Sequence, residues 1–327
     1  MAQRFHNLDD TGAVPGLAWE EMRPGARDPE ARALPPAPLE PLPVVEPDLA
    51  AVFAPSDPLA LKVVWLGHAS ALVRIGGRVF LTDPVEGGLA LVKRQHRRVL
   101  DYAALPPVDA VLLSHDHYDH TDLPTLAKLA PRRPRILGPE GLAAWLARAG
   151  HPAEELRWWS ATDVGGVRVT MVPAQHWSGR TPFGRNRSHW GGYVLEHGGR
   201  RVYFAGDTAW FSGFAAIAQR FPGGFDLALL PIGAYHPRWI FARQHMTPED
   251  AGRAARVLGA RHVLGIHWGA FRLTFERIDE PGRRARVVAA RGSGRRQHAA
   301  PAAGRRPHRP RLRPRASRRA AAFPPAS

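Results

Sequence analysis

Short runs of β-branched and aliphatic residues, separated by glycine and aspartate, dominate the chain from residue 61 onward. Runs of this length with such boundaries are typical of strands in a buried sheet. They predict strands over residues 61–66, 71–75, 79–82, 110–113, 167–172, 192–196, 201–205, 227–232 and 263–266. Helical patterns follow at residues 123–129 and 141–149. A further helix opens after Thr247, with proline at its first position and acids in its first turn.

The strands occur in clusters with helices between them, which points to two sheets with helices outside. We therefore expect an α/β (α+β) fold, an αββα sandwich, over residues 59–281. Residues 1–58 are rich in proline with little hydrophobic periodicity, and predict an extended or irregular arm. Residues 282–327 consist largely of arginine, alanine and proline without an apolar period. Such a segment cannot bury enough surface to offset its ordering entropy, so a disordered tail is expected.

Composition narrows the class of protein. A chain of 327 residues with 44% hydrophobic residues can bury a substantial core. It contains no cysteine, which excludes disulfides, thiolate zinc sites and a cysteine nucleophile. No stretch approaches the roughly 20 apolar residues that a spanning helix needs, and no secretory signal pattern opens the chain. A cytoplasmic location is the expectation.

The net charge of +16 is unevenly distributed along the chain. Residues 282–327 hold 14 arginines and no acidic residue, which leaves 31 basic and 29 acidic residues in the first 281. The predicted folded part is therefore nearly neutral. A charge argument for a nucleic-acid partner applies only to the tail.

A dense polar cluster follows the strand predicted at residues 110–113. It reads His115-Asp116-His117-Tyr118-Asp119-His120. His115 and His117 are two residues apart in extended chain, so their imidazoles project to the same side and can hold one ion. Asp119 and His120 come after the chain turns toward the next helix and can face a second ion. A polar loop with these residues by chance is the alternative, but the placement favours metal binding.

Three later residues can complete two metal sites. His176, Asp207 and His267 each follow the carboxyl end of a predicted strand. Taken singly, a histidine at a strand end is more often a hydrogen-bonded structural residue, and Gly206-Asp207-Thr208 reads equally as a turn. Their common placement strengthens the joint interpretation as ligands.

Together with further motifs, this pattern resembles the metallo-β-lactamase superfamily and, within it, the phospholipases D that hydrolyse N-acylphosphatidylethanolamine and their bacterial relatives. The additional motifs are Trp65-Leu66-Gly67-His68-Ala69, Leu81-Thr82-Asp83-Pro84, Gln175-His176-Trp177, Phe204-Ala205-Gly206-Asp207-Thr208, Leu230-Pro231-Ile232-Gly233-Ala234-Tyr235, Gln244-His245-Met246 and Ile266-His267-Trp268-Gly269. The resemblance covers roughly residues 60–275.

The resemblance implies two zinc ions and a nucleophilic hydroxide shared between them. It assigns the first ion to His115, His117 and His176, the second to Asp119, His120 and His267, and a bridging position to Asp207. Asp119 and His245 are the residues expected to take part in catalysis. Independently of the resemblance, imidazole ligands favour zinc over calcium or magnesium, and zinc lowers the pKa of bound water to about 7.

Other residues are expected around the metals, each with a simpler alternative. His245 can donate to a phosphate oxygen or protonate the leaving alcohol, or be a surface histidine at a loop end. Asp83 can orient a metal-bound imidazole, or belong to an ordinary turn. His68 is expected to line the site from the loop after the first strand. The remaining pocket candidates are Trp177, Tyr235 and Trp268, although most tryptophans of the chain are expected to pack in the core.

The sequence supports three functions to different degrees. The first is a zinc phosphodiesterase of phospholipase D type that releases a phosphatidic acid from N-acylphosphatidylethanolamine-like lipids. The second is a hydrolase of the same fold that acts on another small molecule, a lactone or an amide. The third is a nucleic-acid-processing nuclease, which the nearly neutral body disfavours. A homodimer is a further expectation from the resemblance.

The carboxyl-terminal tract departs from the family that the chain resembles. Those relatives continue after the last metal histidine with a helix and a short strand, whereas Gly282 begins the arginine and alanine tract here. One hypothesis is an altered reading frame near residue 285. The other is a genuine tail that attracts anionic lipid surfaces and gives peripheral membrane contact.

Overall fold

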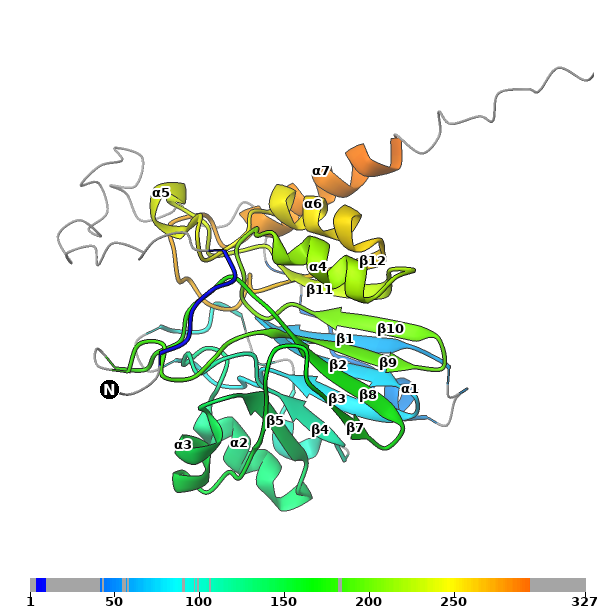
Figure 1. Ribbon diagram of the computed structural model, residues 1–327, viewed down its shortest axis with the longest axis vertical. Coiled ribbons are helices and arrows are strands. Elements are labelled where there is room, and N and C mark those ends of the chain that lie inside the picture. Colours follow the sequence, from blue (N-terminus) through cyan, green and yellow to red (C-terminus); the bar gives the residue numbers. More distant parts are fainter. Residues whose placement is uncertain are drawn as a thin grey trace, which may run out of the picture.

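Two six-stranded sheets lie face to face, with helices on the outer side of each (Figure 1). The computed structural model describes residues 4–9, 42, 44–54, 57, 59–89, 92–96, 98, 100–105, 107–181 and 184–294. The predicted αββα sandwich is therefore confirmed.

The first sheet begins as a meander and continues as a parallel array. Its strands, in spatial order, are β1 (Lys62–Gly67), β2 (Ser70–Ile75), β3 (Arg78–Thr82), β4 (Ala110–Leu112), β5 (Arg135–Pro139) and β6 (Glu154–Leu156). The pairs β1–β2 and β2–β3 are antiparallel, and the pairs from β3 to β6 are parallel. Strands β3 and β4 consequently end at the same edge of the sheet.

The second sheet has the same mixed character. Its strands, in spatial order, are β12 (Ala260–Ile266), β11 (Phe225–Pro231), β10 (Arg200–Phe204), β9 (Gly192–His197), β8 (Val167–Val172) and β7 (Ala161–Val164). The pairs from β7 to β10 are antiparallel, and β10, β11 and β12 are parallel. The parallel strands β10 and β12 therefore end at the same edge of the sheet, with β11 between them.

Apolar residues on both faces of the central strands explain the layered core. On β2, Ala71 and Val73 face the core between the sheets, while Leu72 between them faces the outer helices. The same alternation holds on β4, where Val111 faces outward. Strands covered on both faces read as continuous hydrophobic runs, which is why these strands were visible in the sequence.

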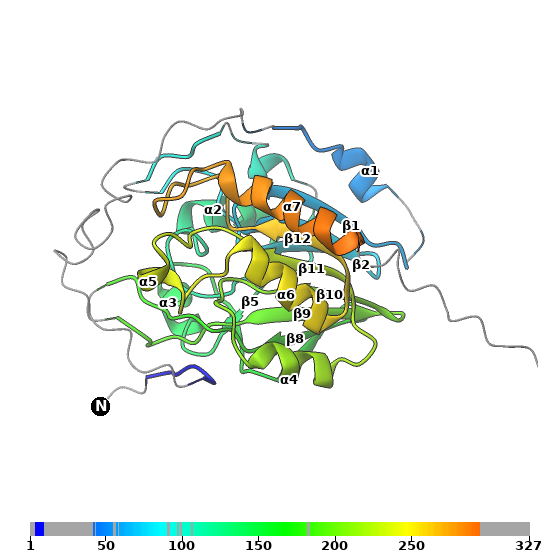
Figure 2. The same cartoon turned by 90° about the horizontal axis from the view of Figure 1, so that it is seen from above.

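Helices cover the outer face of each sheet (Figures 1 and 2). Beside the first sheet lie α1 (Leu49–Phe53), the short helix η2 (Tyr102–Ala104), α2 (Leu123–Leu129), η3 (Ala130–Arg132) and α3 (Ala143–Arg148). Against the second sheet lie α4 (Gly213–Arg220), α6 (Pro248–Leu258) and α7 (Glu280–Gly294), while α5 (Arg238–Phe241) precedes α6. None of the helices in the described parts of the chain is long and apolar enough to cross a membrane.

Helix α6 begins as its sequence predicts. The Thr247 side chain accepts from the amide of Asp250 at 3.2 Å, and the Asp250 carboxylate accepts from the amide of Thr247 at 3.1 Å. This reciprocal capping box satisfies two amides that a helix end leaves without partners. At the other end Gly259 adopts φ 64°, a left-handed conformation suited to glycine.

The predicted disorder from residue 282 is wrong over residues 282–294, which continue α7. Pro281 and Gly282 are buried, and Gly282 lies against the indole of Trp268. The guanidinium of Arg284 pairs with both carboxylate oxygens of Glu249 on α6, at 3.2 and 2.6 Å. A few buried contacts and paired arginines thus order a helix whose sequence shows no broad apolar stripe. Residues 295–327 lie outside the described residues.

The predicted irregular arm over residues 1–58 is also only partly correct. Residues 49–53 form α1, whose Leu49 and Phe53 pack against the outer core of the first sheet. Residues 4–9 form an extended segment beside the second sheet. Most of the residues between these two segments lie outside the described ranges.

Candidate metal centre

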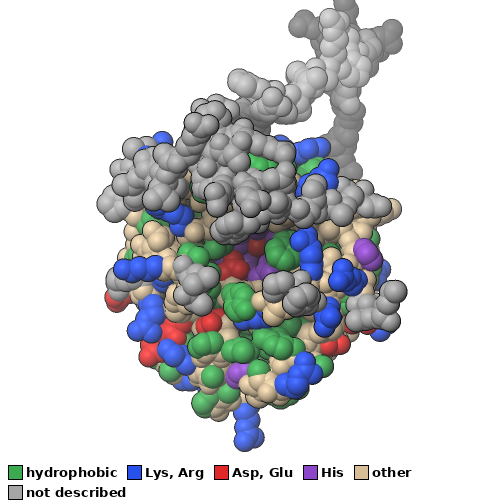
Figure 3. Space-filling view, turned by 90° about the vertical axis from the view of Figure 1, so that its left-hand side faces the viewer, with side chains coloured by type: hydrophobic (Ala, Val, Ile, Leu, Met, Phe, Trp, Pro, Cys, Tyr) green, Lys and Arg blue, Asp and Glu red, His purple; other side chains and the backbone are tan. Residues whose placement is uncertain are grey.

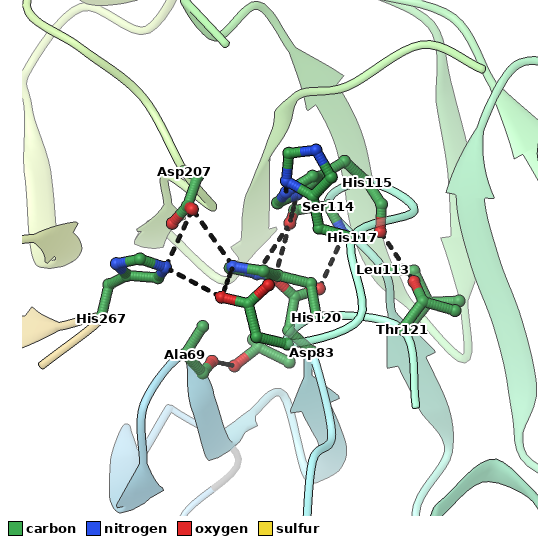
Figure 4. A network of polar contacts seen from close by, with 12 residues as sticks. Ala69, Asp83, Leu113, Ser114, His115, His117, His120, Thr121, Asp207 and His267 are labelled. Carbon is green, nitrogen blue, oxygen red and sulfur yellow. Dashed lines mark hydrogen bonds and ion pairs between the residues drawn. The ribbon is translucent and has the colours of Figure 1, made fainter. Parts of the chain in front are cut away.

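The seven predicted metal ligands converge at one edge of the sandwich. They follow strand ends from both sheets: the cluster 115–120 follows β4, His176 follows β8, Asp207 follows β10 and His267 follows β12. Figure 4 shows Asp207, His267 and His120 pointing toward one another, with His115 and His117 beside them. The strand-end rule used on the sequence therefore identified residues that meet in space.

Three histidines form a first group. Nε2 of His115 lies 2.7 Å from Nδ1 of His117, and Nε2 of His176 lies 3.3 Å from the same Nδ1. Two ligand atoms bound tetrahedrally at about 2.0–2.1 Å from a zinc ion lie roughly 3.3 Å apart. The separation of the His117 and His176 nitrogens matches this value, and that of the His115 and His117 nitrogens is shorter. The ligand atoms of the three histidines all lie within 4.8 Å of one another, close enough to surround a single ion.

A carboxylate and two histidines form a second group. Oδ2 of Asp119 lies 3.4 Å from Nε2 of His120 and 3.3 Å from Nε2 of His267. His68 joins this group, since its Nε2 lies 2.9 Å from the same oxygen of Asp119. The predicted second set of ligands is thus brought together, with His68 in contact with it.

Asp207 stands between the two groups. Its Oδ2 is 2.9 Å from Nε2 of His267 and 3.2 Å from Nε2 of His120. The same oxygen is 3.8 Å from Nε2 of His176 in the first group. A carboxylate that contacts both groups has the position that a bridging ligand requires.

Several buried polar atoms in this centre have no hydrogen-bond partner among the described residues. They are Nε2 of His117, Nε2 of His120, Oδ1 of Asp207, Nδ1 of His245, and Nδ1 of both His68 and His267. Burying a polar atom without a partner costs about 1–3 kcal/mol, so such a concentration needs an explanation. The imidazole nitrogens and carboxylate oxygens that gather between the two groups are ligands suited to divalent metal ions.

The two groups differ in protonation. Burial lowers the pKa of His115 and His117 well below the ordinary histidine value, and lowers the pKa of His176 to about 4. Burial also acts to lower the pKa of His267, but the nearby carboxylates Asp207 and Asp119 outweigh it and raise that pKa to about 9. The first group is therefore neutral at pH 7, whereas the second carries positive charge when no ion is bound.

The pKa values of His120 and Asp207 are set by the same two effects, burial and nearby charge. Burial opposes the charge on His120, yet Asp207, Asp119 and Asp83 hold its pKa well above the ordinary value. Burial likewise acts to raise the pKa of Asp207, but the positive charges of His120 and His267 hold it well below its usual range. In the metal-free chain, the positive charges of the protonated His120 and His267 therefore balance the negative charges of the carboxylates, a task that a bound metal cation would otherwise perform.

Asp83 and Ser114 contact the histidines of the cluster, Asp83 beside His120 and Ser114 beside His115 (Figure 4). The Asp83 carboxylate accepts from the amide of Ser114 at 2.7 Å and from its hydroxyl at 2.6 Å, and lies 2.6 Å from Nδ1 of His120. The Ser114 hydroxyl oxygen is also 2.8 Å from Nδ1 of His115. The structure therefore places Asp83 where the sequence predicted an orienting carboxylate.

His68 and His267 share an unusual backbone geometry. They adopt φ 54° and φ 61°, in the left-handed region, and the amide of His267 donates to the carbonyl of His68 at 3.0 Å. Their rings lie 4.2 Å apart between centroids. Strained backbone conformations of this kind persist where surrounding structure enforces them, commonly at functional sites.

His245 and Trp177 also reach the centre. The ring of His245 stacks beside that of His267 at 5.3 Å, and its Nδ1 lies 3.9 Å from Oδ2 of Asp207. Trp177 meets the ring of His117 edge to face at 4.2 Å. Burial lowers the pKa of His245 well below its ordinary value, so its imidazole is neutral and offers one donor and one acceptor.

Tyr235 and Trp268, the remaining predicted pocket residues, line two separate cavities, and Trp268 lines its own together with His267. The Tyr235 hydroxyl donates to Glu280 on α7 at 2.7 Å, and its side chain lines a cavity of about 320 Å³ together with Arg238 and Arg277. Trp268 stacks on Trp65 at 5.3 Å and covers the start of α7. Their side chains also join α7 to the fold.

The sequence interpretation missed residues that hold the ligands in place. Ser114 ends an apolar strand directly before His115, which was a usable signal. The carbonyl of Gln244 lies 3.1 Å from Nδ1 of His176, and its side-chain oxygen accepts from the Trp177 indole at 3.0 Å. Asn7, far away in the sequence, bonds to the backbone of His176. No local pattern could have connected Asn7 with the centre.

Figure 3 views the molecule from the left-hand side of Figure 1. Histidine and acidic side chains are visible near the middle of this face, with hydrophobic side chains below them and cationic ones to either side. The guanidinium of Arg185 covers the ring of Trp177 at 4.7 Å, and that of Arg180 covers Tyr118 at 3.9 Å. Arginine and aromatic side chains thus lie close to the centre.

Comparison with known proteins agrees with this geometry. The family model described as a beta-lactamase superfamily domain matches residues 78–268, a range that contains all seven predicted ligands. An uncharacterized protein of Mycobacterium tuberculosis is 37% identical over 298 residues, which cover 87% of this chain and 78% of that protein. N-acyl-phosphatidylethanolamine-hydrolyzing phospholipase D 1 of Caenorhabditis elegans is 35% identical over 230 residues, covering 64% of each chain.

Solved structures share the fold at lower identity. A novel metallo hydrolase from the hyperthermophilic archaeon Ignicoccus hospitalis KIN4/I superposes with a TM-score of 0.55 and 21% identity, over 71% of this chain and 91% of that one. At this identity the likeness concerns the fold alone. Because the family model matches more than half of the chain, the chain belongs to the β-lactamase superfamily and is a metal-dependent hydrolase with the metallo-β-lactamase fold.

Proposed function

We propose that the protein is a binuclear zinc phosphodiesterase of phospholipase D type that acts on N-acylphosphatidylethanolamine-like lipids. The observation that carries the proposal is the pair of ligand groups joined by Asp207, which contacts both. The C. elegans relative, whose name gives this activity, supports the substrate class. The proposed reaction breaks the phosphodiester bond to the headgroup by addition of water, and yields a phosphatidic acid and an N-acylethanolamine.

The donor set supports zinc and a count of two. Five imidazoles and two carboxylates suit zinc better than calcium or magnesium, which prefer oxygen ligands. Two buried atoms without a partner among the described residues face the ligand groups: Nε2 of His120 in the second group and Oδ1 of Asp207 between the two groups. When bound, two zinc ions would supply a hydroxide nucleophile near neutral pH and stabilise negative charge on a phosphodiester.

Residues of this chain beside the ligands have separate tasks in the proposed reaction. His245 is neutral and close to Asp207, so its N–H can donate to a phosphate oxygen or to the leaving oxygen. Trp177 packs edge-on against His117 and, with the hydrophobic side chains on this face, can contact an acyl chain. The guanidinium of Arg185 above Trp177 would face the anionic headgroup.

A direct assay tests the substrate class. The zinc-loaded full-length chain would be offered N-palmitoyl-phosphatidylethanolamine in mixed micelles, with release of N-palmitoylethanolamine and phosphatidic acid followed by mass spectrometry. We expect both products in equal amounts, and no turnover by His117→Ala. Unacylated phosphatidylethanolamine, a lactone panel, an amide panel and RNA serve as comparison substrates. Turnover of a lactone, an amide or RNA without turnover of the lipid would overturn the proposal.

A further inference from the structure

An extended segment near the start of the chain, residues 4–9, lies against the metal centre, and we call it the strap. It runs beside the second sheet at the left of Figure 1, and the same dark blue segment lies next to the N marker in Figure 2. Its side chains alternate, with Phe5, Asn7 and Asp9 half-buried and the residues between them exposed. Such alternation means that one side of the strap is fitted to the protein.

Both ends of the strap are fixed. The amide of Phe5 donates to the carbonyl of Asn186 at 3.0 Å, the Asn186 side chain donates back to the Phe5 carbonyl at 3.3 Å, and the Phe5 ring meets His189 at 4.5 Å. At the other end, the Asp9 carboxylate accepts from the amide of Ser212 at 2.9 Å and from its hydroxyl. Asn7 is thereby held between two anchors.

At the centre of the strap, both the nitrogen and the oxygen of the Asn7 side-chain amide form hydrogen bonds. Its Nδ2 donates to the carbonyl of His176 at 2.9 Å, and its Oδ1 accepts from the amide of His176 at 3.0 Å. The same Oδ1 accepts from the indole N–H of Trp190 at 3.0 Å, on a side chain that is fully buried. The peptide groups on both sides of His176 are therefore bonded to one side chain.

We propose that Asn7 is a positioning residue for the metal ligand His176, so that the strap forms part of the metal centre. Asn7 fixes the backbone of His176, while the carbonyl of Gln244 fixes its ring at Nδ1. Together these contacts aim Nε2 at the space shared with His115 and His117. The inference rests on the proposed function in one respect, since it takes His176 as a ligand.

The effect of losing Asn7 should be confined to one ion. Asn7 touches His176 of the first group, and within the described part of the chain its hydrogen bonds do not reach Asp119, His120 or His267. Removing a residue that orients a metal ligand typically weakens metal affinity 10- to 100-fold. We therefore expect one zinc ion to bind more weakly while the other keeps its affinity.

The test uses the zinc-loaded full-length chain and three variants. Asn7→Ala removes all three bonds, and Asn7→Asp keeps the acceptor oxygen but loses the donor to His176. Leu8→Ala is the matched control, because Leu8 lies on the same strap with 47% of its surface exposed. Each protein would be equilibrated with graded chelator, and bound zinc per chain would be measured. Absorption of the cobalt-substituted proteins would report ligand geometry.

Asn7→Ala should release one of two zinc ions at chelator concentrations about 10- to 100-fold lower than the unsubstituted chain, with an altered cobalt spectrum. The zinc affinity of Asn7→Asp should lie between those of Asn7→Ala and the unsubstituted chain, and Leu8→Ala should match the unsubstituted chain. Equal zinc retention in Asn7→Ala and Leu8→Ala would overturn the inference alone. Equal weakening of both ions in Asn7→Ala would also overturn it, since that indicates general loss of structure. An unsubstituted chain that binds no zinc would overturn the proposed function as well.

Discussion

Oδ2 of Asp83 lies 2.6 Å from Nδ1 of His120, and both side chains are fully buried. A proton held between these two atoms leaves Nε2 of His120 as the nitrogen directed toward Asp119 and Asp207. A carboxylate behind a metal-bound imidazole fixes its orientation and increases its basicity. The contact therefore connects the end of β3 with a predicted metal ligand.

The first prediction concerns Asp83→Asn, which keeps the shape of the side chain and removes its charge. Its backbone φ of 30° is tolerated by asparagine, so the fold should be retained. We expect about 10- to 100-fold weaker binding of the second zinc ion, measured by chelator competition. Asp163→Asn, at an exposed position of β7, is the matched control and should bind zinc normally. Unchanged affinity for both ions in Asp83→Asn would show that the contact is only structural.

The second prediction separates the two ligand groups. His117 belongs to the first group alone, whereas Asp207 contacts His176 in the first and His120 and His267 in the second. His117→Ala should therefore lose one zinc equivalent, and Asp207→Ala should weaken both. Zinc per chain, measured by elemental analysis after gel filtration in dilute chelator, gives the answer. Complete zinc loss in His117→Ala with one ion kept in Asp207→Ala would reverse the assigned division.

Sequence reasoning succeeded where chemistry and chain position coincide. His176, Asp207 and His267 were predictable because each follows a strand whose apolar run is visible, and parallel strands bring their carboxyl ends to one edge. The strand β8 and the helix α2 match their predicted bounds. Thr247 was predictable as a helix cap because capping depends on residues three positions apart.

The features that the sequence did not predict depend on exposed edge strands or on contacts between residues far apart in the chain. The edge strands β6 and β7, with sequences Glu-Glu-Leu and Ala-Thr-Asp-Val, offer little apolar signal because they are short and partly exposed. Asn7 bonds to His176 across 169 positions, and no local pattern encodes such a pair. The order of α7 likewise depends on Trp268 and Glu249, which come from other elements.

The third prediction follows from the unequal protonation of the two groups. Since the pKa of His267 is about 9 and that of His120 is well above the ordinary value, both are protonated in the metal-free chain at pH 7.5. Ligands must lose their protons to bind a metal, so binding of the second ion should release about two protons. The first ion should release none, because the pKa of His176 is about 4.

Affinity for the second ion should accordingly rise as the pH increases toward about 9, the pKa of His267, while affinity for the first stays constant over the same range. Calorimetric titration with zinc in buffers of different ionisation enthalpy measures the protons released at each step. Asp207→Asn offers a control, since loss of its charge should lower the pKa of His267 and reduce the release. Equal proton release for both ions would contradict the assigned protonation states.

The last prediction concerns Gly282, the residue at which the sequence predicted the start of disorder. A Cβ added there would lie 2.3 Å from Cη2 of Trp268, too close for any side chain. By helix propensity alone, Gly282→Ala would stabilise α7 by about 1 kcal/mol. Because overpacking costs about 1–3 kcal/mol, we expect the observed change to be destabilising. Urea unfolding with a constant m-value measures the free energy of unfolding.

Val287→Ala supplies the control for this experiment, because Val287 lies on the same helix with 50% of its surface exposed. It should change the free energy of unfolding by no more than about 0.5 kcal/mol. A stabilised Gly282→Ala would show that α7 forms without packing on Trp268. No change in either variant would indicate that the chain is unstructured from residue 282. Destabilisation of Gly282→Ala alone would establish that α7 closes the outer face of the second sheet through its contact with Trp268.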